Sequence, residues 1–190
     1  MNFEELTRLA MDAGFTHVAP LDVHTIDLKA EVRDMCASGG CGKYGACWSC
    51  PPACGTLDEC RARVLQYTKG IIVQTVGELE DPLDGEGMME TEDAHKKSFD
   101  RMYALLRVQH ADVLALGAGG CKKCAVCTYP DAPCRRPDEM VSSMEAYGML
   151  VTEVCRRNHL KYYYGQNTIA YLGCFLFGRE DETHGCAEHL

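Results

Sequence analysis

The spacing of hydrophobic residues predicts a helix and then a strand at the start of the chain. Apolar side chains recur at three- and four-residue intervals from Phe3 to Ala13, and Gly14 follows them. Because a glycine directly after such a stretch is a common helix C-terminus, the pattern predicts an amphipathic helix over residues 3–13. A short strand is expected next, over residues 17–21.

The rest of the chain repeats this order of elements. After the first strand, the pattern predicts a polar connection, a cysteine-rich loop, a helix, a strand and an acidic surface loop. The second half then repeats the series helix, strand, cysteine-rich loop, helix and strand. Glycines and prolines between the cysteines make regular structure improbable in both loops. The helices are expected at 57–67, 92–110 and 143–158, the strands at 69–76, 112–116 and 162–177 (one or two strands broken near Gly165 and Gly173), and the surface loop at 78–90.

The cysteine spacing agrees with an internal repeat. Cys36 and Cys121 are 85 residues apart, and Cys50 and Cys134 are 84 apart. Few other side chains repeat at this offset, so an internal duplication is a hypothesis. It would give a pseudo-symmetric domain with both cysteine loops on one side of the sheet.

Length and composition indicate one globular domain over residues 1–190. The chain is 46% hydrophobic and 25% charged, which excludes disorder and fibrous repeats. The predicted fold class is α/β or α+β, with a small sheet flanked by helices. Cysteine-rich loops at 36–54 and 121–134 carry the candidate chemistry.

Charge narrows the choice of partners and compartment. Lys and Arg number 19 and Asp and Glu 28, so the formal net charge is −9, and nucleic acid is not an expected partner. The N-terminus is acidic where a signal peptide is basic, and no apolar stretch approaches about 18 residues, so we expect a cytoplasmic protein without a membrane span. Reducing conditions disfavour disulfides, and the 13 cysteines therefore indicate metal ligation first and redox catalysis second.

The second loop has the more specific motif. Cys121, Cys124, Cys127 and Cys134 follow the pattern C-x2-C-x2-C-x6-C, and Pro137 comes three residues later. This resembles the bacterial ferredoxin run C-x2-C-x2-C-x3-C-P, apart from the longer final gap. Structural zinc, the alternative, usually has two C-x2-C pairs separated by a dozen residues or more. The spacing favours an iron–sulfur cluster.

The first loop offers five cysteines for four ligand places. Cys50 is followed by proline, as in a ferredoxin ligand. We select Cys36, Cys41, Cys47 and Cys50 and leave out Cys54, although Cys47 is almost as doubtful. Cys47 and Cys50 also form a C-x2-C pair, but the Trp and Pro positions differ from those of thioredoxin-type motifs.

The remaining cysteines are expected to be structural. Cys60 and Cys155 lie on apolar helix faces, and Cys174 lies in a strand-like apolar run. Cys186 stands between two histidines, a ligand-like arrangement in a tail that we expect to be frayed.

Three segments together resemble a known family of small bacterial and archaeal proteins, which are known mainly as predicted metal-binding proteins of unknown function. The segments are Cys36 to Pro52 with Cys41, Tyr44-Gly45 and Cys50-Pro51-Pro52; Cys121-x2-Cys124-x2-Cys127 with Pro133-Cys134-Arg135 and Pro137; and Ser143-Met-Glu-Ala-Tyr-Gly148. The resemblance implies a cysteine-ligated metal. It matches seven of the selected cysteines and not Cys47, so the fourth ligand of the first loop stays open.

These observations lead to three hypotheses. The first is a redox protein with two 4Fe-4S clusters that passes electrons to an enzyme partner, its acidic surface steering the docking. The second is an enzyme with an open, three-cysteine cluster acting on a small molecule of sulfur or methyl-group metabolism. The third is a zinc-stabilised interaction module. In the first hypothesis no residue is catalytic, and the cofactor and metal ligands are Cys36, Cys41, Cys47, Cys50, Cys121, Cys124, Cys127 and Cys134.

Overall fold

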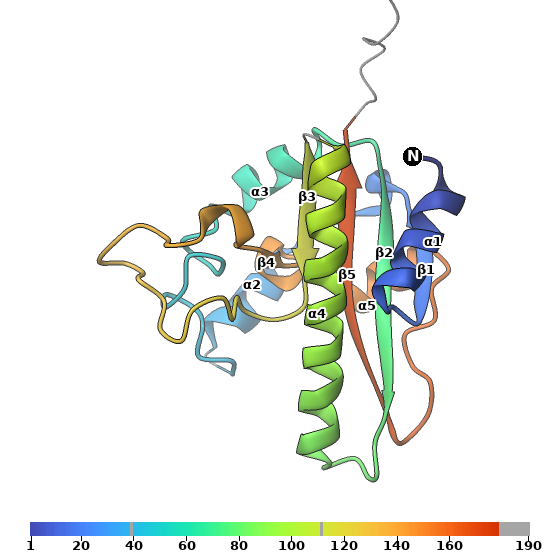
Figure 1. The fold of residues 1–190 in the computed structure, drawn as a ribbon. Helices are drawn as coiled ribbons and strands as arrows, with labels where there is room; N and C mark the ends of the chain where they lie inside the picture. The colour runs from blue at the N-terminus through green and yellow to red at the C-terminus, as the bar shows by residue number, and fades with distance from the viewer. Residues whose placement is uncertain (39, 111, 179–190) are drawn as a thin grey trace, which may run out of the picture.

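A five-stranded mixed sheet forms the centre of the computed structural model, which describes residues 1–38, 40–110 and 112–178. The strand order is β1-β2-β5-β3-β4, and only β3 and β4 run parallel to each other. The fold is therefore of the α+β class, as the sequence predicts (Figure 1). The strands are β1 His17–Leu21, β2 Lys69–Glu78, β3 Val113–Gly117, β4 Ser142–Ser143 and β5 Thr168–Phe177.

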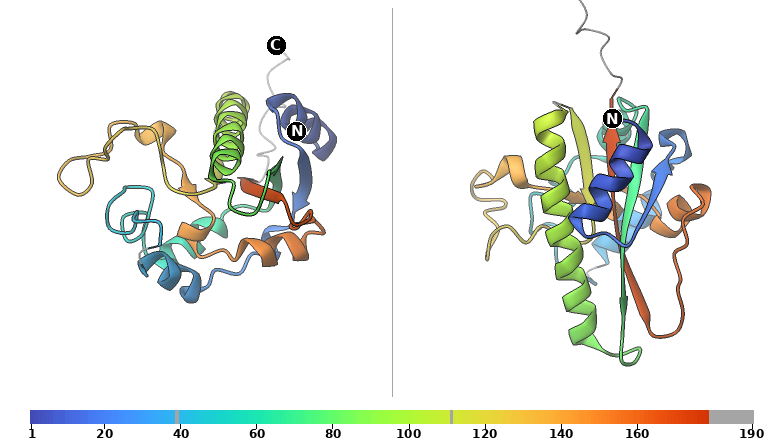
Figure 2. Two further views of the ribbon diagram at one scale, coloured as in Figure 1. Left: turned by 90° about the horizontal axis from the view of Figure 1, so that it is seen from below. Right: turned by 45° about the vertical axis from the view of Figure 1, so that its right-hand side comes forward.

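Helices cover both faces of the sheet. Buried residues of α1 and α4 form one hydrophobic core with the sheet, and buried residues of α3 and α5 form a second core on the opposite face (Figure 2). No helix in the described ranges is long and apolar enough to cross a membrane. The α-helices are α1 Phe3–Ala13, α2 Ala30–Ala37, α3 Leu57–Val64, α4 Gly85–Gln109 and α5 Val151–Arg157, and the short 3₁₀ helices are η1 Val23–Thr25, η2 Pro137–Glu139 and η3 Glu145–Tyr147.

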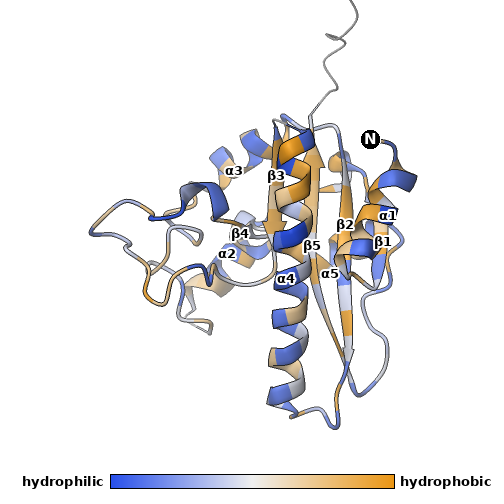
Figure 3. Ribbon diagram, in the orientation of Figure 1, coloured by the Kyte–Doolittle hydropathy of each residue, from blue (hydrophilic) through white to orange (hydrophobic). Residues whose placement is uncertain are grey.

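The central pair of strands is the longest ladder of the sheet. β2 and β5 pair antiparallel over ten residues each, from Lys69 opposite Phe177 to Glu78 opposite Thr168. Ile72 packs into the core under α3 and α5, whereas its neighbour Ile71 packs into the core under α1 and α4. Burial on both faces explains why this strand is a continuous apolar run, and Figure 3 shows the hydrophobic centre of the sheet.

The repeated order of elements is present in the structure. The first half runs α1, β1, loop, α3, β2, and the second runs α4, β3, loop, α5, β5. The strand order β1-β2-β5-β3 is symmetric about the central ladder. Both cysteine loops lie beyond β4, on one side of the sheet, as predicted (Figure 1). The order of elements and strands agrees with an internal duplication, which stays a hypothesis.

Two segments that were expected to lack regular structure contain helices. The acidic stretch expected to be a surface loop becomes α4 from Gly85, because the Asp84 side chain accepts a hydrogen bond from the Gly87 N–H at 2.9 Å and caps the helix. Acidic residues on the exposed side of α4 make the helical spacing of its hydrophobic residues hard to recognise in the sequence. The polar connection before the first cysteine loop contains α2, whose last turn carries Cys36.

Two boundaries differ in the second half. The helix expected from residue 143 begins only at Val151, because the preceding residues form β4 and η3. β5 continues through Gly173 without a break. That glycine has a packing role, since a Cβ there would collide with the Phe99 ring and lie 3.0 Å from the Leu116 carbonyl oxygen.

Replacing Gly173 should therefore destabilise the sheet. We expect Gly173→Ala to lower the free energy of unfolding by about 1–3 kcal/mol, the usual cost of overpacking. Gly85→Ala is the matched control, because nothing lies within 4 Å of a Cβ there. Urea unfolding measures both, and a Gly173→Ala protein as stable as the control would contradict the packing argument.

His95 is a polar residue buried between α4 and the sheet. Its ring is 0% exposed, its Nδ1 lies 3.0 Å from the Thr75 Oγ1, and its Nε2 has no hydrogen-bond partner among the described residues. Burial lowers the pKa of His95 to about 4, and nearby Lys96 acts in the same direction. The folded protein thus holds this imidazole neutral.

This burial predicts a stability loss in acid. Between about pH 6.5 and pH 4 the unfolded chain binds the His95 proton and the folded chain does not, so stability should fall by about 3 kcal/mol as the pH decreases through this window. His95→Gln should flatten this slope in urea unfolding at several pH values. Exposed His24→Gln should keep it, and an unchanged slope in His95→Gln would contradict the buried neutral imidazole.

Candidate metal centre

The two cysteine loops contact each other beside β4. The Trp48 indole Nε1–H donates to the Ala132 carbonyl oxygen at 3.0 Å, and the Trp48 ring meets Tyr129 edge-on with centroids 4.9 Å apart. The Cys121 N–H donates to the Ser49 hydroxyl oxygen at 3.3 Å. These contacts join segments more than 70 residues apart, and they shape two cysteine-lined cavities.

The first pocket is a cavity of about 270 Å³ with three cysteines in its wall. Cys36 comes from the last turn of α2, whereas Cys41 and Cys50 come from the loop that follows. Glu145 of η3 lies in the same wall, and no lysine, arginine or histidine is among the lining residues. The first pocket therefore presents three thiols and one carboxylate, together with the hydroxyl groups of Tyr44 and Ser143.

Burial and neighbouring anions disfavour ionised thiols in the first pocket. Burial raises the pKa of Cys36, and Cys41 and Glu145 raise it further. Burial also raises the pKa of Cys50 to about 11. A metal that binds here must displace these protons, so binding would become tighter as the pH rises.

The second pocket is lined by five cysteines around a space of only about 20 Å³, which is room for about one water molecule. Four of them, Cys121, Cys124, Cys127 and Cys134, come from the predicted motif of the second loop. The fifth is Cys47 of the first loop, whose side chain is 4% exposed.

The two loops affect thiol ionisation differently from one cysteine to the next: burial raises the pKa of Cys121, whereas the pKa of Cys127 is lowered. Burial opposes ionisation of Cys127, but backbone N–H groups of Tyr129, Trp48 and Thr128 favour the thiolate, and the net effect lowers the pKa. One of these groups belongs to the opposite loop. The loop contact therefore also tunes the chemistry of the pocket.

The structure assigns Cys47 differently from the sequence analysis. We expected it to complete the first loop's ligand set, but its side chain lies among the cysteines of the second loop. Ser49 stands between the two pockets, with its hydroxyl oxygen 3.2 Å from the Cys47 Sγ and 3.7 Å from the Cys50 Sγ. The first pocket is left with three cysteines.

Glu145 is the site residue that the sequence analysis missed. Glu145 lies within the Ser143–Gly148 motif, but a lone glutamate carries no spacing signal. Only the packing of η3 against α2 brings it to the cysteines.

The remaining described cysteines lie outside both pockets. Cys60, Cys155 and Cys174 are at most 1% exposed and belong to the core, as predicted. The Cys54 thiol donates to the Ala146 carbonyl oxygen at 3.6 Å, and the Cys60 thiol donates to the Cys54 carbonyl oxygen at 3.8 Å. Cys186 lies outside the described residues.

The thiols are free and spread apart. All twelve cysteines of the described residues are unpaired thiols. In the same part of the chain, no three His, Cys, Asp or Glu side chains converge closely enough to hold a single metal ion. The two pockets therefore gather soft ligands without bringing them to one point.

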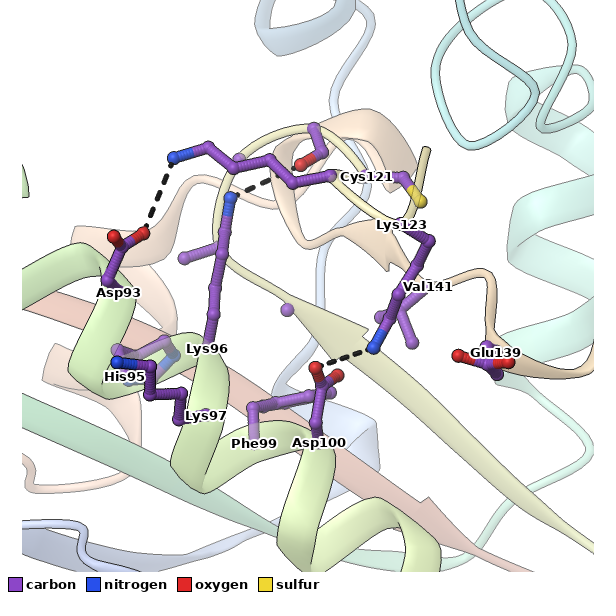
Figure 4. A pocket seen from close by; sticks show the side chains of 15 residues that line it. Asp93, His95, Lys96, Lys97, Phe99, Asp100, Cys121, Lys123, Glu139 and Val141 are labelled. Carbon is purple, nitrogen blue, oxygen red and sulfur yellow. Dashed lines mark hydrogen bonds and ion pairs between the residues drawn. The ribbon is translucent and has the colours of Figure 1, made fainter. Parts of the chain in front are cut away.

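A third cavity, of about 270 Å³, lies between α4 and the segment that follows β3 (Figure 4). Three of its four lysines are paired with carboxylates of α4. Glu92 forms ion pairs with Lys96 at 2.7 Å and Lys122 at 2.8 Å, and Asp100 pairs with Lys123 at 2.5 Å. These ion pairs link the beginning of the second cysteine loop to α4, and they neutralise the positive charge beside Cys121.

The comparisons with known proteins give one match. The model of a family described as "Predicted metal-binding protein (DUF2284)" matches residues 19–177, which is most of the chain and includes both pockets. Neither the curated proteins nor the solved structures contain a match.

The Ser49 hydroxyl should stabilise the junction of the two loops. Ser49→Ala leaves the Cys121 N–H without its acceptor, so we expect the free energy of unfolding of the reduced, metal-free protein to fall by about 1–3 kcal/mol. Ser38→Ala, which removes an exposed hydroxyl that donates to the Met35 carbonyl oxygen, is the control. Equal unfolding midpoints of the two variants in urea would contradict the role of Ser49.

Proposed function

The chain belongs to this family of predicted metal-binding proteins (DUF2284), and from that membership we propose that it is an iron–sulfur redox protein with one four-iron cluster in each cysteine pocket. The observation that carries the proposal is the pairing of the pockets. All eight cysteines selected from the sequence line two neighbouring cavities, and the buried cysteines of the core line neither.

The donor chemistry restricts the metal to a soft-ligand group. Thiolates bind zinc and iron–sulfur clusters well. A zinc ion with four Zn–S bonds of about 2.3 Å draws its sulfurs to within roughly 4 Å of each other. A cluster carries its irons at the corners of a cube and needs thiolates that are farther apart. Between these two groups, the C-x2-C-x2-C spacing of the second loop favours the cluster.

The second pocket offers more ligands than one cluster needs. The Cys121, Cys124 and Cys127 triple supplies three thiolates on one side, and Cys134 or Cys47 supplies the fourth. The loop must move outward to admit a cluster, because the present space is small. It contains no helix or strand between β3 and η2, so it can move without breaking the sheet.

Electron transfer is the activity that we propose for this pair of sites. Bound clusters accept and release single electrons. Cys47 and Cys50 are three residues apart and face different pockets, so the protein would hold the two clusters near each other. Cys41 of the first pocket is exposed, which gives a partner enzyme access, and the net charge of −9 would steer a basic docking surface.

Exchange of a single cysteine tests the proposal. Cys124→Ser should lose about four iron and four sulfide per chain and should unfold more easily, because ligand binding is coupled to folding of the loop. Cys155→Ser, a buried thiol of the core, should keep the wild-type iron content. Iron and acid-labile sulfide analysis after anaerobic purification, with EPR of the reduced protein, measures the difference.

Two results would refute the proposal. Stoichiometric zinc without sulfide would support the zinc-stabilised module instead. Equal iron content in Cys124→Ser and Cys155→Ser would contradict the assignment of Cys124 as a cluster ligand.

A further inference from the structure

The first pocket holds one cysteine fewer than a fully thiolate-ligated cluster requires. A four-iron cluster has four corners to ligate, and only Cys36, Cys41 and Cys50 line this cavity. We propose that the carboxylate of Glu145 is the fourth protein ligand of the first pocket. This inference rests on the proposed function, since it specifies the ligand set of one of the two clusters.

The backbone around Glu145 is held firmly. The Gly148 N–H donates to the Glu145 carbonyl oxygen at 2.8 Å, and the Ala146 N–H donates to the Ser143 hydroxyl at 3.0 Å. The residues on either side, Met144 and Ala146, are 0% and 2% exposed. A rigid segment of this kind keeps the carboxylate in the pocket wall, as a ligand requires.

The wall of the first pocket contains no cation, although the Arg33 charge outside the wall acts on Cys36. Among the described residues the Glu145 side chain has no hydrogen bond or ion pair, and no cationic side chain lines the cavity. A half-buried carboxylate beside three thiols is costly when the thiols ionise, because like charges repel in a poorly solvated site. Bound cationic iron turns this repulsion into attraction, and that explains why the four groups share one wall.

Two other oxygen donors face the same cavity and are less suitable. The Ser143 hydroxyl caps the Ala146 N–H, and it would have to lose a proton to become an anionic ligand. The Tyr44 phenol likewise carries a proton that it would have to lose to become an anionic ligand. Among the described residues that line this cavity, Glu145 is the only one with a carboxylate.

A carboxylate is a harder ligand than a thiolate and holds iron less firmly in a sulfur-rich site. The iron next to Glu145 should therefore be the first to leave on oxidation. Loss of an outer-shell partner alone costs 10–100-fold in metal affinity, so removal of a direct ligand should speed this loss by at least about tenfold.

The test compares iron retention in the loaded protein. Wild type, Glu145→Gln and Glu145→Cys are reconstituted anaerobically and then treated with ferricyanide, with iron per chain and the EPR signal of the three-iron form followed over time. We expect Glu145→Gln to lose one iron at least about tenfold faster than wild type. Glu145→Cys should retain that iron better than wild type, because it restores a fourth thiolate. Glu31→Gln, the same change at an exposed position of α2, should match wild type.

The outcomes separate this inference from the proposed function. Wild type without iron and sulfide would overturn both. Two clusters in wild type, with Glu145→Gln equal to it in iron loss and EPR spectrum, would overturn the role of Glu145 alone. If Glu145→Gln folds poorly, retention by Glu145→Cys still distinguishes a ligand from a structural support.

Discussion

The antiparallel ladder between β2 and β5 is the interaction on which the rest of the structure depends. β2 closes the first half of the chain and β5 closes the second, so this pairing fixes the two halves to each other over ten residues. Its residues alternate between two cores, and the helices on both faces are positioned by them. The cysteine loops have little regular structure of their own, and they meet only because the sheet holds their ends.

Electrostatics imposes the second constraint, at the edge of the sheet. Eight thiols and one carboxylate share two small cavities, while the lysines nearest to the second loop are already paired with α4. A protein could hold such a set of groups as neutral thiols, but a lone carboxylate in the first pocket would remain unpaired. The arrangement is consistent with a site that reaches its stable state only when a cation is bound.

Local patterns were sufficient for much of the fold and for selecting the eight cysteines that line the two pockets. The Asn2 capping box and the left-handed Gly14 bound α1 as its periodicity predicts, and the buried run of β2 was recognised from its apolar residues. The start of α4 was not, because a solvated helix rich in acidic residues looks like a loop in the sequence. The position of Cys47 depends on contacts between loops more than 70 residues apart, and no spacing rule contains that information.

The segment from Cys47 to Cys50 is a wall common to both pockets, and this has a consequence for assembly. Loading either pocket would fix the backbone of this segment, together with the Ser49 hydroxyl between the two thiols. The conformational entropy of ordering the wall is then lost only once, so the second cluster would bind to a site that the first has partly preorganised. Insertion of the two clusters would be positively cooperative, and chains with a single cluster would be a minor species at partial iron loading.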